Sequence, residues 1–469
     1  MKFKPQRIRD PLHNLIEFQA NQFENQLWQV IQTRPFQRLR RIKQLGFSDL
    51  VYPGATHSRF AHSVGVFHTA RRLMRIIKRH LGDQDYEDTK ANTAIAAALV
   101  HDLGHGPFSH AFEDVGRRLN LKLTRHELMS DTLIREGEVA EALNVLVSGL
   151  ANDVAAMVKN GGTDIYSAVV SSQFDADRLD YMRRDQLMTG TQHGSIDYEW
   201  LLANLEVGDV PFGVDEEKLG TIETFVLGPK AVHGAEAYVL GLFQLYPTVY
   251  FHKTTRGAEK LFTEVMVRAL TLIKDGSAKN TGLHSKHPIV RFARKSDRTD
   301  SVLDLDDTVV WGSLGYMIEA SDPTVKDLAK RLRDRNLYKA IDVRESVKRE
   351  LGLEEVASLD PVIDKACASI RSKVVEWQST HAAKNPARVL SDVAEREPYK
   401  QFQESKGPLN QIRIRTNSNE LVDLGERSKV VRAIETFKLF RLYVSETDDQ
   451  ARTFIKKTIR EEAKNAAKE

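Results

Sequence analysis

The sequence predicts a mainly α fold, in which a helical bundle is followed by a small α+β C-terminal region. Residues 57–80 place apolar side chains on one face at helical spacing, and the Ala-rich run 94–100 is typical of a buried helix. Residues 411–415 and 420–424 alternate polar and apolar side chains around the turn 416–419, as strands of a hairpin do. Helices are therefore expected to dominate, with strands near the C-terminus.

Turn and capping residues divide the chain into further elements. Pro35 separates two N-terminal helices, and Gly161-Gly162 ends a helix before Thr163 or Asp164 caps the next. Helices are expected at 22–33, 34–45, 57–80 and 88–102, two within 126–160, one from 163 to about 188, one or two within 230–274, and at 323–335 and 360–383. Further expectations are a short hairpin within 207–228, a strand at 437–444 and a charged helical tail at 447–469.

Composition is that of a soluble globular protein. The 469 residues are 41% hydrophobic and 28% charged, and they suffice for two or three domains. A net charge of +3 is too small to indicate a nucleic-acid partner by itself. One cysteine, Cys367, excludes an internal disulfide, and no stretch approaches the roughly 18 apolar residues of a membrane span. A cytoplasmic protein without a membrane partner is expected.

Residues 99–113, Leu-Val-His-Asp-Leu-Gly-His-Gly-Pro-Phe-Ser-His-Ala-Phe-Glu, carry the central motif. Adjacent helix residues point about 100° apart, so His101 and Asp102 can share a target only where the helix ends. Gly104, Gly106 and Pro107 provide that break. An imidazole and a carboxylate suit Fe, Mn, Zn or Mg ions. An isolated His-Asp pair is more often a core histidine beside a helix-terminal aspartate, but the surrounding residues favour a metal site.

Those surroundings are rich in histidine, since eight of the 15 histidines lie between His57 and His126. The order His62, then His101-Asp102, then Asp177 is similar to the ligand order of the HD phosphohydrolase superfamily. The chain resembles more closely the HD-domain deoxynucleoside triphosphate triphosphohydrolases, which include bacterial dGTPases and the vertebrate restriction factor that depletes dNTPs. The resemblance extends from about Arg9 to about Arg256 and is carried by residues 36–46, 57–65, 101–110 and 175–185.

The resemblance implies a divalent metal ion, the identity of which stays open among Mn, Fe, Zn and Mg. Its ligands would be His62, His101, Asp102 and Asp177. The resemblance also places three catalytic histidines, with His110 facing the bridge between phosphate and sugar and His105 and His126 along the phosphates. Imidazole titrates near neutral pH, which suits acid–base work, although core packing is the alternative interpretation.

Cationic side chains are expected to hold the triphosphate. Arg59 is three residues before His62 and shares its helix face, so it is well placed for a phosphate oxygen that the metal also touches. By resemblance, Arg178 and Lys253 also lie near phosphate.

Asp177, Tyr181 and Asp185 recur every four residues and form a stripe about 12 Å long on one helix. The family places a metal ligand, a sugar-packing tyrosine and a 3′-hydroxyl-binding aspartate at these positions. The resemblance further implies that Gln44 and Leu45 touch sugar and base, and that Tyr250 disfavours a ribose hydroxyl. An ion pair with a neighbouring arginine is the ordinary interpretation of Asp185 alone.

The expected domains follow from where these motifs end. Residues 1–275 would form the HD phosphohydrolase domain, with motifs at 34–66, 99–113, 174–190 and 244–257. A polar linker is expected at 276–301, and an α+β accessory region of unassigned role at 302–469.

The sequence therefore predicts an enzyme that hydrolyses dNTPs to deoxynucleoside and tripolyphosphate. One alternative is an HD phosphohydrolase for a cyclic or alarmone nucleotide, which the metal ligands alone do not exclude. A second is a nucleic-acid-binding protein with a secondary HD site, because Arg38, Arg40, Arg41 and Lys43 crowd one segment. A solvated helix face is the ordinary interpretation of such a charge run.

The resemblance also implies a homo-oligomer, a dimer or tetramer. Vertebrate members are activated by guanine nucleotides bound between subunits, where an aspartate before a Thr-Pro step reads the guanine edge. Gln32 takes its place here, and Arg9 replaces a family asparagine. A glutamine amide has one uncharged acceptor oxygen and reads guanine poorly. We therefore expect no activation by GTP alone, and an allosteric nucleotide of another base remains a candidate partner.

Overall fold

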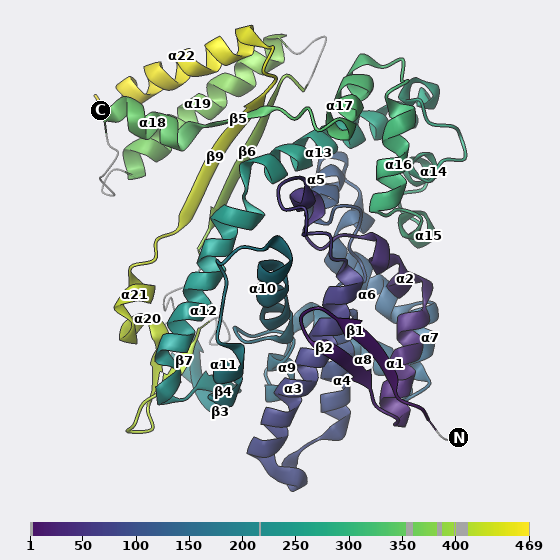
Figure 1. The fold of residues 1–469 in the computed structure, drawn as a ribbon, viewed down its shortest axis with the longest axis vertical. Helices are drawn as coiled ribbons and strands as arrows, with labels where there is room; N and C mark the ends of the chain where they lie inside the picture. Colours follow the sequence, from purple (N-terminus) through teal and green to yellow (C-terminus); the bar gives the residue numbers. More distant parts are fainter. Residues whose placement is uncertain are drawn as a thin grey trace. The chain divides into compact units, whose positions relative to one another are not determined.

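The computed structural model describes residues 3–214, 217–352, 360–381, 387–397, 399 and 411–468. It confirms the predicted mainly helical fold with small sheets (Figure 1). The chain forms two compact units. The first unit comprises Met1–Tyr250, Asp297–Asp307 and Glu397–Glu435, and the second comprises Phe251–Ser296, Thr308–Arg396 and Thr436–Glu469. The predicted domain division at 275 and 301 stays a prediction about independent folding.

The first unit is a helical bundle built around two helices that carry the central motifs. Ser58 caps α3 (Arg59–Asp85) by accepting the N–H of Ala61. The Ala-rich α4 (Asp88–Val100) has every residue from Ala94 to Val100 buried, as predicted. Small side chains let neighbouring helices approach it closely. The other helices of this unit are α1 (Gln22–Gln32), α2 (Arg34–Arg38), α5 (His110–Leu119), α6 (His126–Arg135), α7 (Glu138–Asn144), α8 (Leu150–Asn160), α9 (Ile165–Ala168), α10 (Ala176–Thr189), α11 (Tyr198–Ala203), α12 (Val232–Leu245), α15 (Thr299–Leu303), α20 (Leu424–Arg427) and α21 (Lys429–Arg432).

Two predicted helices of this unit are shorter than expected. The helix predicted at 34–45 ends at Arg38 and continues as a 3-10 turn, η1 (Leu39–Arg41). Ile42 is extended there because its carbonyl accepts the N–H of Arg59, a tertiary bond that replaces a helical one. The helix predicted from 163 to 188 is split into α9 and α10, and Asp175 caps α10 by accepting the N–H of Arg178.

Three further 3-10 turns and one π-helical turn complete the helical segments of the first unit. They are η2 (Gly46–Leu50), η3 (Lys122–Thr124), η4 (Pro229–Ala231) and the π turn η5 (Tyr246–Tyr250).

Two small sheets belong to the first unit. The N-terminal hairpin pairs β1 (Gln6–Asp10) with β2 (Asn14–Phe18), and its tight turn places Asn14 at a φ of 62°. The predicted hairpin within 207–228 is present as β3 (Leu205–Val214) and β4 (Glu217–Leu227). The predicted strands near 411–424 are β7 (Arg413–Arg415) and β8 (Leu421–Asp423), and they extend this hairpin into a sheet of order β3-β4-β7-β8.

The second unit contains an antiparallel sheet of order β5-β9-β6, made of β5 (Lys339–Asp342), β9 (Phe437–Val444) and β6 (Val389–Arg396). Helices α18 (Val343–Leu351), α19 (Asp360–His381) and α22 (Asp449–Ala466) gather beside it (Figure 1). Their apolar residues form a core with alternate residues of β9, namely Phe440, Leu442 and Val444. The remaining elements of this unit are α13 (Lys253–Lys274), η6 (Ala278–Thr281), α14 (Pro288–Arg294), α16 (Asp307–Met317) and α17 (Pro323–Arg333).

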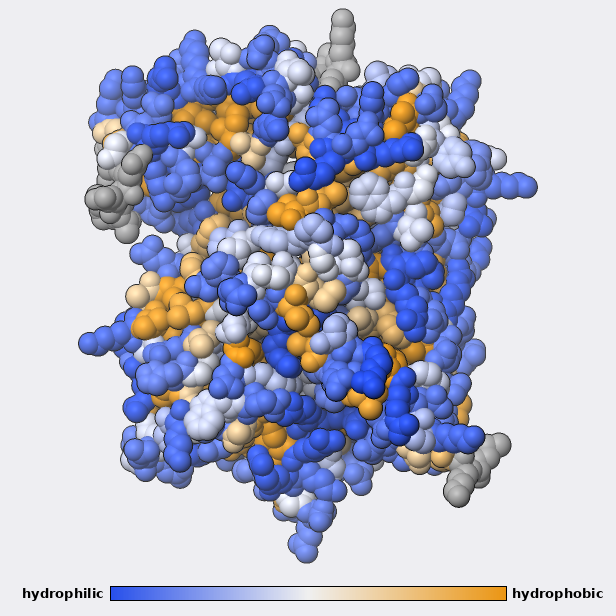
Figure 2. All heavy atoms as spheres, viewed as in Figure 1, coloured by the Kyte–Doolittle hydropathy of each residue, from blue (hydrophilic) through white to orange (hydrophobic). Residues whose placement is uncertain are grey.

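The face shown in Figure 2 is mostly hydrophilic, with apolar side chains in separate groups. Among the described residues, no helix combines the length and the apolar character needed to cross a bilayer.

Candidate functional site

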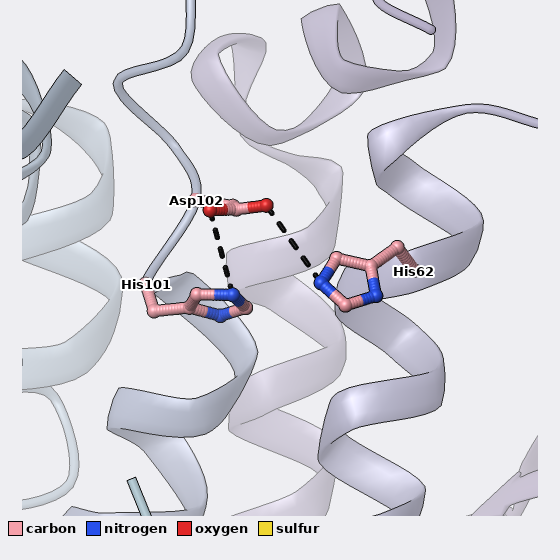
Figure 3. Close-up of side chains that lie close together, drawn as sticks. All are labelled: His62, His101 and Asp102. Atoms are coloured by element: carbon pink, nitrogen blue, oxygen red, sulfur yellow. Dashed lines mark ion pairs between the residues drawn. The ribbon is translucent and has the colours of Figure 1, made fainter. Parts of the chain in front are cut away.

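The four predicted metal ligands converge from three helices of the first unit. His62 lies in the first turns of α3, His101 and Asp102 directly follow α4, and Asp177 lies in the first turn of α10. Nε2 of His62 is 2.9 Å from Oδ1 of Asp177 and 3.8 Å from Oδ2 of Asp102. Nε2 of His101 is 3.4 Å from Oδ1 of Asp102 (Figure 3). The same nitrogen is 3.7 Å from Oδ1 of Asp177. The adjacent His101 and Asp102 share this target because α4 ends just before them.

The chemistry of this cluster fits a divalent metal ion. Nε2 of His62 and Nε2 of His101 are buried, and neither makes a hydrogen bond of good geometry within the described part of the chain. Ligand atoms of His62, His101 and Asp102 all lie within 4.8 Å of one another. Two imidazole nitrogens facing two carboxylates form a donor set suited to Zn, Fe or Mn, and buried unpaired nitrogens are otherwise unfavourable.

The carboxylates also control the charges of this cluster. Burial lowers the pKa of His62, but the nearby carboxylates of Asp177 and Asp180 outweigh it and raise the pKa to about 10. Burial raises the pKa of Asp102, yet the charges of Arg59, His101 and His105 hold it well below its usual range. Both aspartate ligands, Asp102 and Asp177, are therefore ionised at neutral pH, as metal ligation requires.

Arg59 lies within this cluster, as predicted from its spacing to His62. Its guanidinium forms a close ion pair with Oδ2 of Asp102, and its Nε donates to Oγ of Ser109 at 2.9 Å. Both side chains are buried. Ser109 has a φ of 56°, so the loop after Asp102 adopts an uncommon backbone conformation that the arginine contacts.

The three predicted catalytic histidines lie together around a carboxylate that the sequence analysis overlooked. The rings of His105 and His126 stack with centroids 4.1 Å apart, and His110 lies 5.4 Å from His105. Glu113 contacts Nδ1 of His126 closely and lies 3.3 Å from Nδ1 of His110. Burial raises the pKa of Glu113, but hydrogen bonds from both imidazoles lower it below its usual range. Glu113 lies three residues after His110 on the same helix, and this spacing alone could have predicted their contact from the sequence.

His105 differs from the other two histidines because it is almost completely buried. Its Nε2 lies 3.3 Å from Oδ1 of Asp102, whereas its Nδ1 has no hydrogen-bond partner among the described residues. Burial and the charge of Arg59 lower its pKa well below the usual value. His105 is therefore neutral at physiological pH and links the metal-ligand cluster to the His110–Glu113–His126 group.

A cavity of about 500 Å³ adjoins these groups. His101, Asp102 and Asp177 line one part of it, and His126 lines another. Two cations absent from the predicted site, Arg125 and Lys159, also line the cavity. The cavity therefore brings imidazoles, carboxylates and cations to one space, as binding of a phosphate ester requires.

The predicted sugar-binding residues are close to one another but are already hydrogen-bonded. Tyr250 donates its O–H to Oδ2 of Asp185 at 2.9 Å, and Nε2 of His57 lies 2.8 Å from Oδ1. The rings of Tyr181 and Tyr250 meet edge to face at 6.4 Å. Asp185 is buried, and it pairs with His57 rather than with a neighbouring arginine. His57 was not among the predicted site residues, although it lies in the first motif.

Four other predicted residues lie in three separate places. Gln44 and Leu45 occupy the bend before η2, where the N–H of Gln44 donates to the carbonyl of His57. Arg178 on α10 donates to the carbonyl of Ser172 at 2.8 Å. Lys253 begins α13 in the second unit. Their contacts with substrate stay predictions.

The basic segment 34–43 faces acidic residues rather than solvent alone. Arg38 is fully buried and donates to the carbonyl of Leu305 at 2.8 Å, while Arg41 pairs with Asp306 at 2.6 Å. The interpretation of the whole segment as a solvated face is therefore wrong for Arg38. The Arg41–Asp306 pair, together with an ion pair between Lys43 and Asp49, neutralises part of the charge that favoured a nucleic-acid partner.

Comparison with known proteins agrees with this geometry. A family model described as HD domain matches residues 59–182. The uncharacterized protein YwfO of Bacillus subtilis is 32% identical over 336 residues, which cover 71% of each chain. Bovine SAMHD1, a deoxynucleoside triphosphate triphosphohydrolase, is 25% identical over 489 residues, which cover 94% of this chain and 75% of SAMHD1.

Solved structures show the same fold. A phosphohydrolase of Bacteroides thetaiotaomicron has a TM-score of 0.70 at 24% identity, with 94% of this chain and 100% of that chain covered. The chain thus belongs to the family of HD-domain proteins that includes YwfO and the SAMHD1 triphosphohydrolases.

Proposed function

We propose that this protein is a metal-dependent deoxynucleoside triphosphate triphosphohydrolase. The observation that carries the proposal is the stripe on α10, which begins at Asp177 in the metal-ligand cluster and ends at Asp185, where Tyr250 and His57 contact its carboxylate. Its length of about 12 Å suits a substrate with phosphate at one end and sugar at the other. The SAMHD1 relatives support the choice of a deoxynucleoside triphosphate.

The phosphate end of the proposed site carries three cations. Arg59 is buried beside Asp102, and Arg125 and Lys159 line the cavity next to His126. These groups would neutralise the triphosphate and its pentavalent transition state. A divalent ion held by His62, His101, Asp102 and Asp177 would add Lewis-acid polarisation of a phosphoryl oxygen.

The histidine group would serve the leaving oxygen. Water attacks the α-phosphorus, the bond from phosphorus to the 5′-oxygen breaks, and that oxygen takes a proton as deoxynucleoside and tripolyphosphate separate. Glu113 lies at Nδ1 of His110, so Nε2 is the nitrogen left to deliver that proton. His105 and His126 would line the phosphates.

The sugar end would select deoxyribose. A carboxylate accepts more hydrogen bonds than the two that Asp185 receives from Tyr250 and His57, so it retains capacity for a 3′-hydroxyl. Tyr181 and Tyr250 together form an aromatic wall beside it. The proposal keeps the predicted contacts of Gln44 and Leu45 with sugar and base. It also keeps those of Arg178 and Lys253 with phosphate. The predicted dimer or tetramer is part of the same proposal.

The experiment that tests this proposal incubates the purified protein with Mn²⁺ and each dNTP, each NTP, a cyclic dinucleotide or an alarmone nucleotide. Products are separated by ion-exchange chromatography. We expect deoxynucleoside and tripolyphosphate in equal amounts from at least one dNTP. Release of diphosphate or single phosphate, or turnover confined to the other nucleotides, would replace the proposal with another HD phosphohydrolase activity.

A pair of variants tests whether His110 is the general acid that protonates the leaving oxygen. His110→Ala is expected to lower kcat by roughly 10²- to 10⁴-fold, the range for loss of a general acid. His80→Ala removes a half-exposed histidine on α3 and serves as the matched control with unchanged kcat. Equal activity of both variants would show that His110 does not protonate the leaving oxygen.

A further inference from the structure

The imidazole of His62 has a different environment at each nitrogen. Nε2 faces the carboxylates of Asp102 and Asp177, whereas Nδ1 lies 2.9 Å from Oδ2 of Asp180. His62 and Asp180 are both completely buried. Nε2 offers a lone pair to a metal ion only while Nδ1 carries the proton that Asp180 accepts.

Asp180 is held by side chains that approach it from two elements. Arg184 on α10 donates from Nε to Oδ2 at 2.7 Å and from Nη2 to Oδ1 at 3.0 Å. Nε2 of His13 lies 2.7 Å from Oδ1. With the contact to His62 included, each carboxylate oxygen has two hydrogen-bond partners. These contacts fix the orientation of Asp180 toward His62.

The N-terminal hairpin anchors this group. Arg184 also donates from Nη1 to Oδ2 of Asp10 at 2.7 Å, and Asp10 accepts the backbone N–H groups of Leu12 and His13 in the turn between β1 and β2. Arg184 is completely buried and Asp10 nearly so. Residues at the very start of the chain thus reach the partner of a metal ligand.

The charges of this group do not cancel. Asp10 and Asp180 are carboxylates and Arg184 is one cation, so the buried group carries one net negative charge when His13 and His62 are neutral. An uncompensated buried charge is costly, and a positive charge at Nε2 of His62, either a second proton or a metal ion, relieves it. A carboxylate at the second nitrogen of a ligating histidine fixes the ring and raises its basicity.

Gly65 provides the space for this arrangement. It lies one helical turn after His62 on α3, and a Cβ at this position would collide with Oδ1 of Asp180 and Nη2 of Arg184. Glycine in a helix interior is otherwise unfavourable. The close approach of α10 to α3 therefore depends on the missing side chain.

We propose that Asp180, which Arg184 and His13 hold in the space left by Gly65 while Asp10 anchors Arg184, is a positioning residue that sets the affinity of His62 for the metal ion. The inference rests on the metal site of the proposed function, but it concerns ion binding and not the substrate.

The test measures Mn²⁺ binding to the metal-free full-length protein without nucleotide, from the electron paramagnetic resonance signal of free Mn²⁺. Asp180→Asn removes the negative charge, and Gly65→Ala displaces Asp180 while leaving every ligand intact. We expect Mn²⁺ affinity to fall by roughly 10- to 100-fold in both variants, the range for loss of such a partner. His13→Ala, which removes one donor to Asp180, is expected to give a smaller loss.

The control variant is Gly241→Ala, which adds a methyl group to an interior position of α12, where it would approach the backbone of Gly194 to 3.0 Å. Its Mn²⁺ affinity should equal that of the wild type. Thermal unfolding of each metal-free variant separates folding from binding. Wild-type affinity in folded Asp180→Asn and Gly65→Ala would overturn the proposal, as would an equal loss in Gly241→Ala. If both variants fail to fold, wild-type affinity in His13→Ala would overturn it.

Failure of the two proposals can be distinguished. A protein whose Mn²⁺ affinity depends on Asp180 but which hydrolyses no dNTP would overturn the proposed substrate and leave this inference standing. A protein that hydrolyses dNTPs with wild-type Mn²⁺ affinity in all three variants would overturn this inference alone.

Discussion

Tyr250 donates its phenolic O–H to Oδ2 of Asp185 at 2.9 Å. The other carboxylate oxygen faces Nε2 of His57, so a tyrosine, an aspartate and a histidine from three distant segments share one buried group. Such a group is stable only while each member is paired, because an unpaired buried carboxylate is costly. The proposed sugar contact therefore depends on residues that also support one another.

The first prediction concerns this sugar contact. Asp185→Ala should lower kcat/KM for a dNTP by roughly 10- to 100-fold, since a hydrogen bond to a charged group contributes about 1.5–3 kcal/mol. A 3′-deoxy substrate lacks the partner hydroxyl, so the same mutation should reduce its turnover only slightly. Steady-state kinetics of both proteins on both substrates form a double-mutant cycle. Strictly additive losses would mean that Asp185 does not contact the 3′-hydroxyl.

The second prediction concerns the metal ligands. His101→Ala or Asp102→Ala should lose bound metal and activity together, because each removes one of four donors and opens the cluster to water. Elemental analysis of the purified variants gives the metal content. His233→Ala, which removes an exposed histidine in α12, is the control and should keep full metal content. Full occupancy in both ligand variants would disprove this ligand assignment.

The third prediction concerns pH and stability. Burial, His13 and nearby arginines lower the pKa of His68 from its usual 6.5 to about 4. Between these pH values His68 is protonated in the unfolded chain but not in the folded chain. Its contribution to the free energy of unfolding therefore rises with pH through this window. This stabilising contribution is complete above about pH 6.5 and is lost as the pH falls toward 4.

Replacing His68 by Gln, which does not titrate, should flatten this dependence. Urea unfolding at pH 4.5, 5.5 and 7 measures it, and the wild type should lose more free energy of unfolding toward pH 4.5 than the variant. Parallel curves for the two proteins would show that His68 is protonated equally in both states.

The fourth prediction concerns activation. Gln32 ends α1, is exposed, and offers an uncharged amide, which is a poor partner for the donor groups of a guanine edge. Arg38, one of the nearby cations, is buried against the carbonyl of Leu305 and unavailable to a nucleotide. GTP alone should therefore not raise the initial rate on a dNTP. A saturable stimulation by GTP that vanishes in Gln32→Ala would show that this position reads guanine.

Local sequence determined much of the fold and the placement of several proposed site residues. The Ala-rich run before His101 and the glycines after Asp102 dictate a buried helix that ends at a His-Asp pair, because small side chains pack closely and glycine breaks helices. The four-residue spacing of Asp177, Tyr181 and Asp185 likewise places them on one face of α10. Helix formation, helix ends and the sharing of one helix face depend on neighbouring residues, so a periodic pattern in the sequence predicts them.

Only the tertiary structure decided what each side chain pairs with. Glu113 accepts from two histidines, Asp180 faces His62, and Asp185 faces His57 across 128 residues of sequence. The helix predicted to continue to residue 45 instead ends early because Ile42 and Arg59 form a backbone bond between segments. Long-range pairing depends on which elements pack together, and no local periodicity encodes that choice.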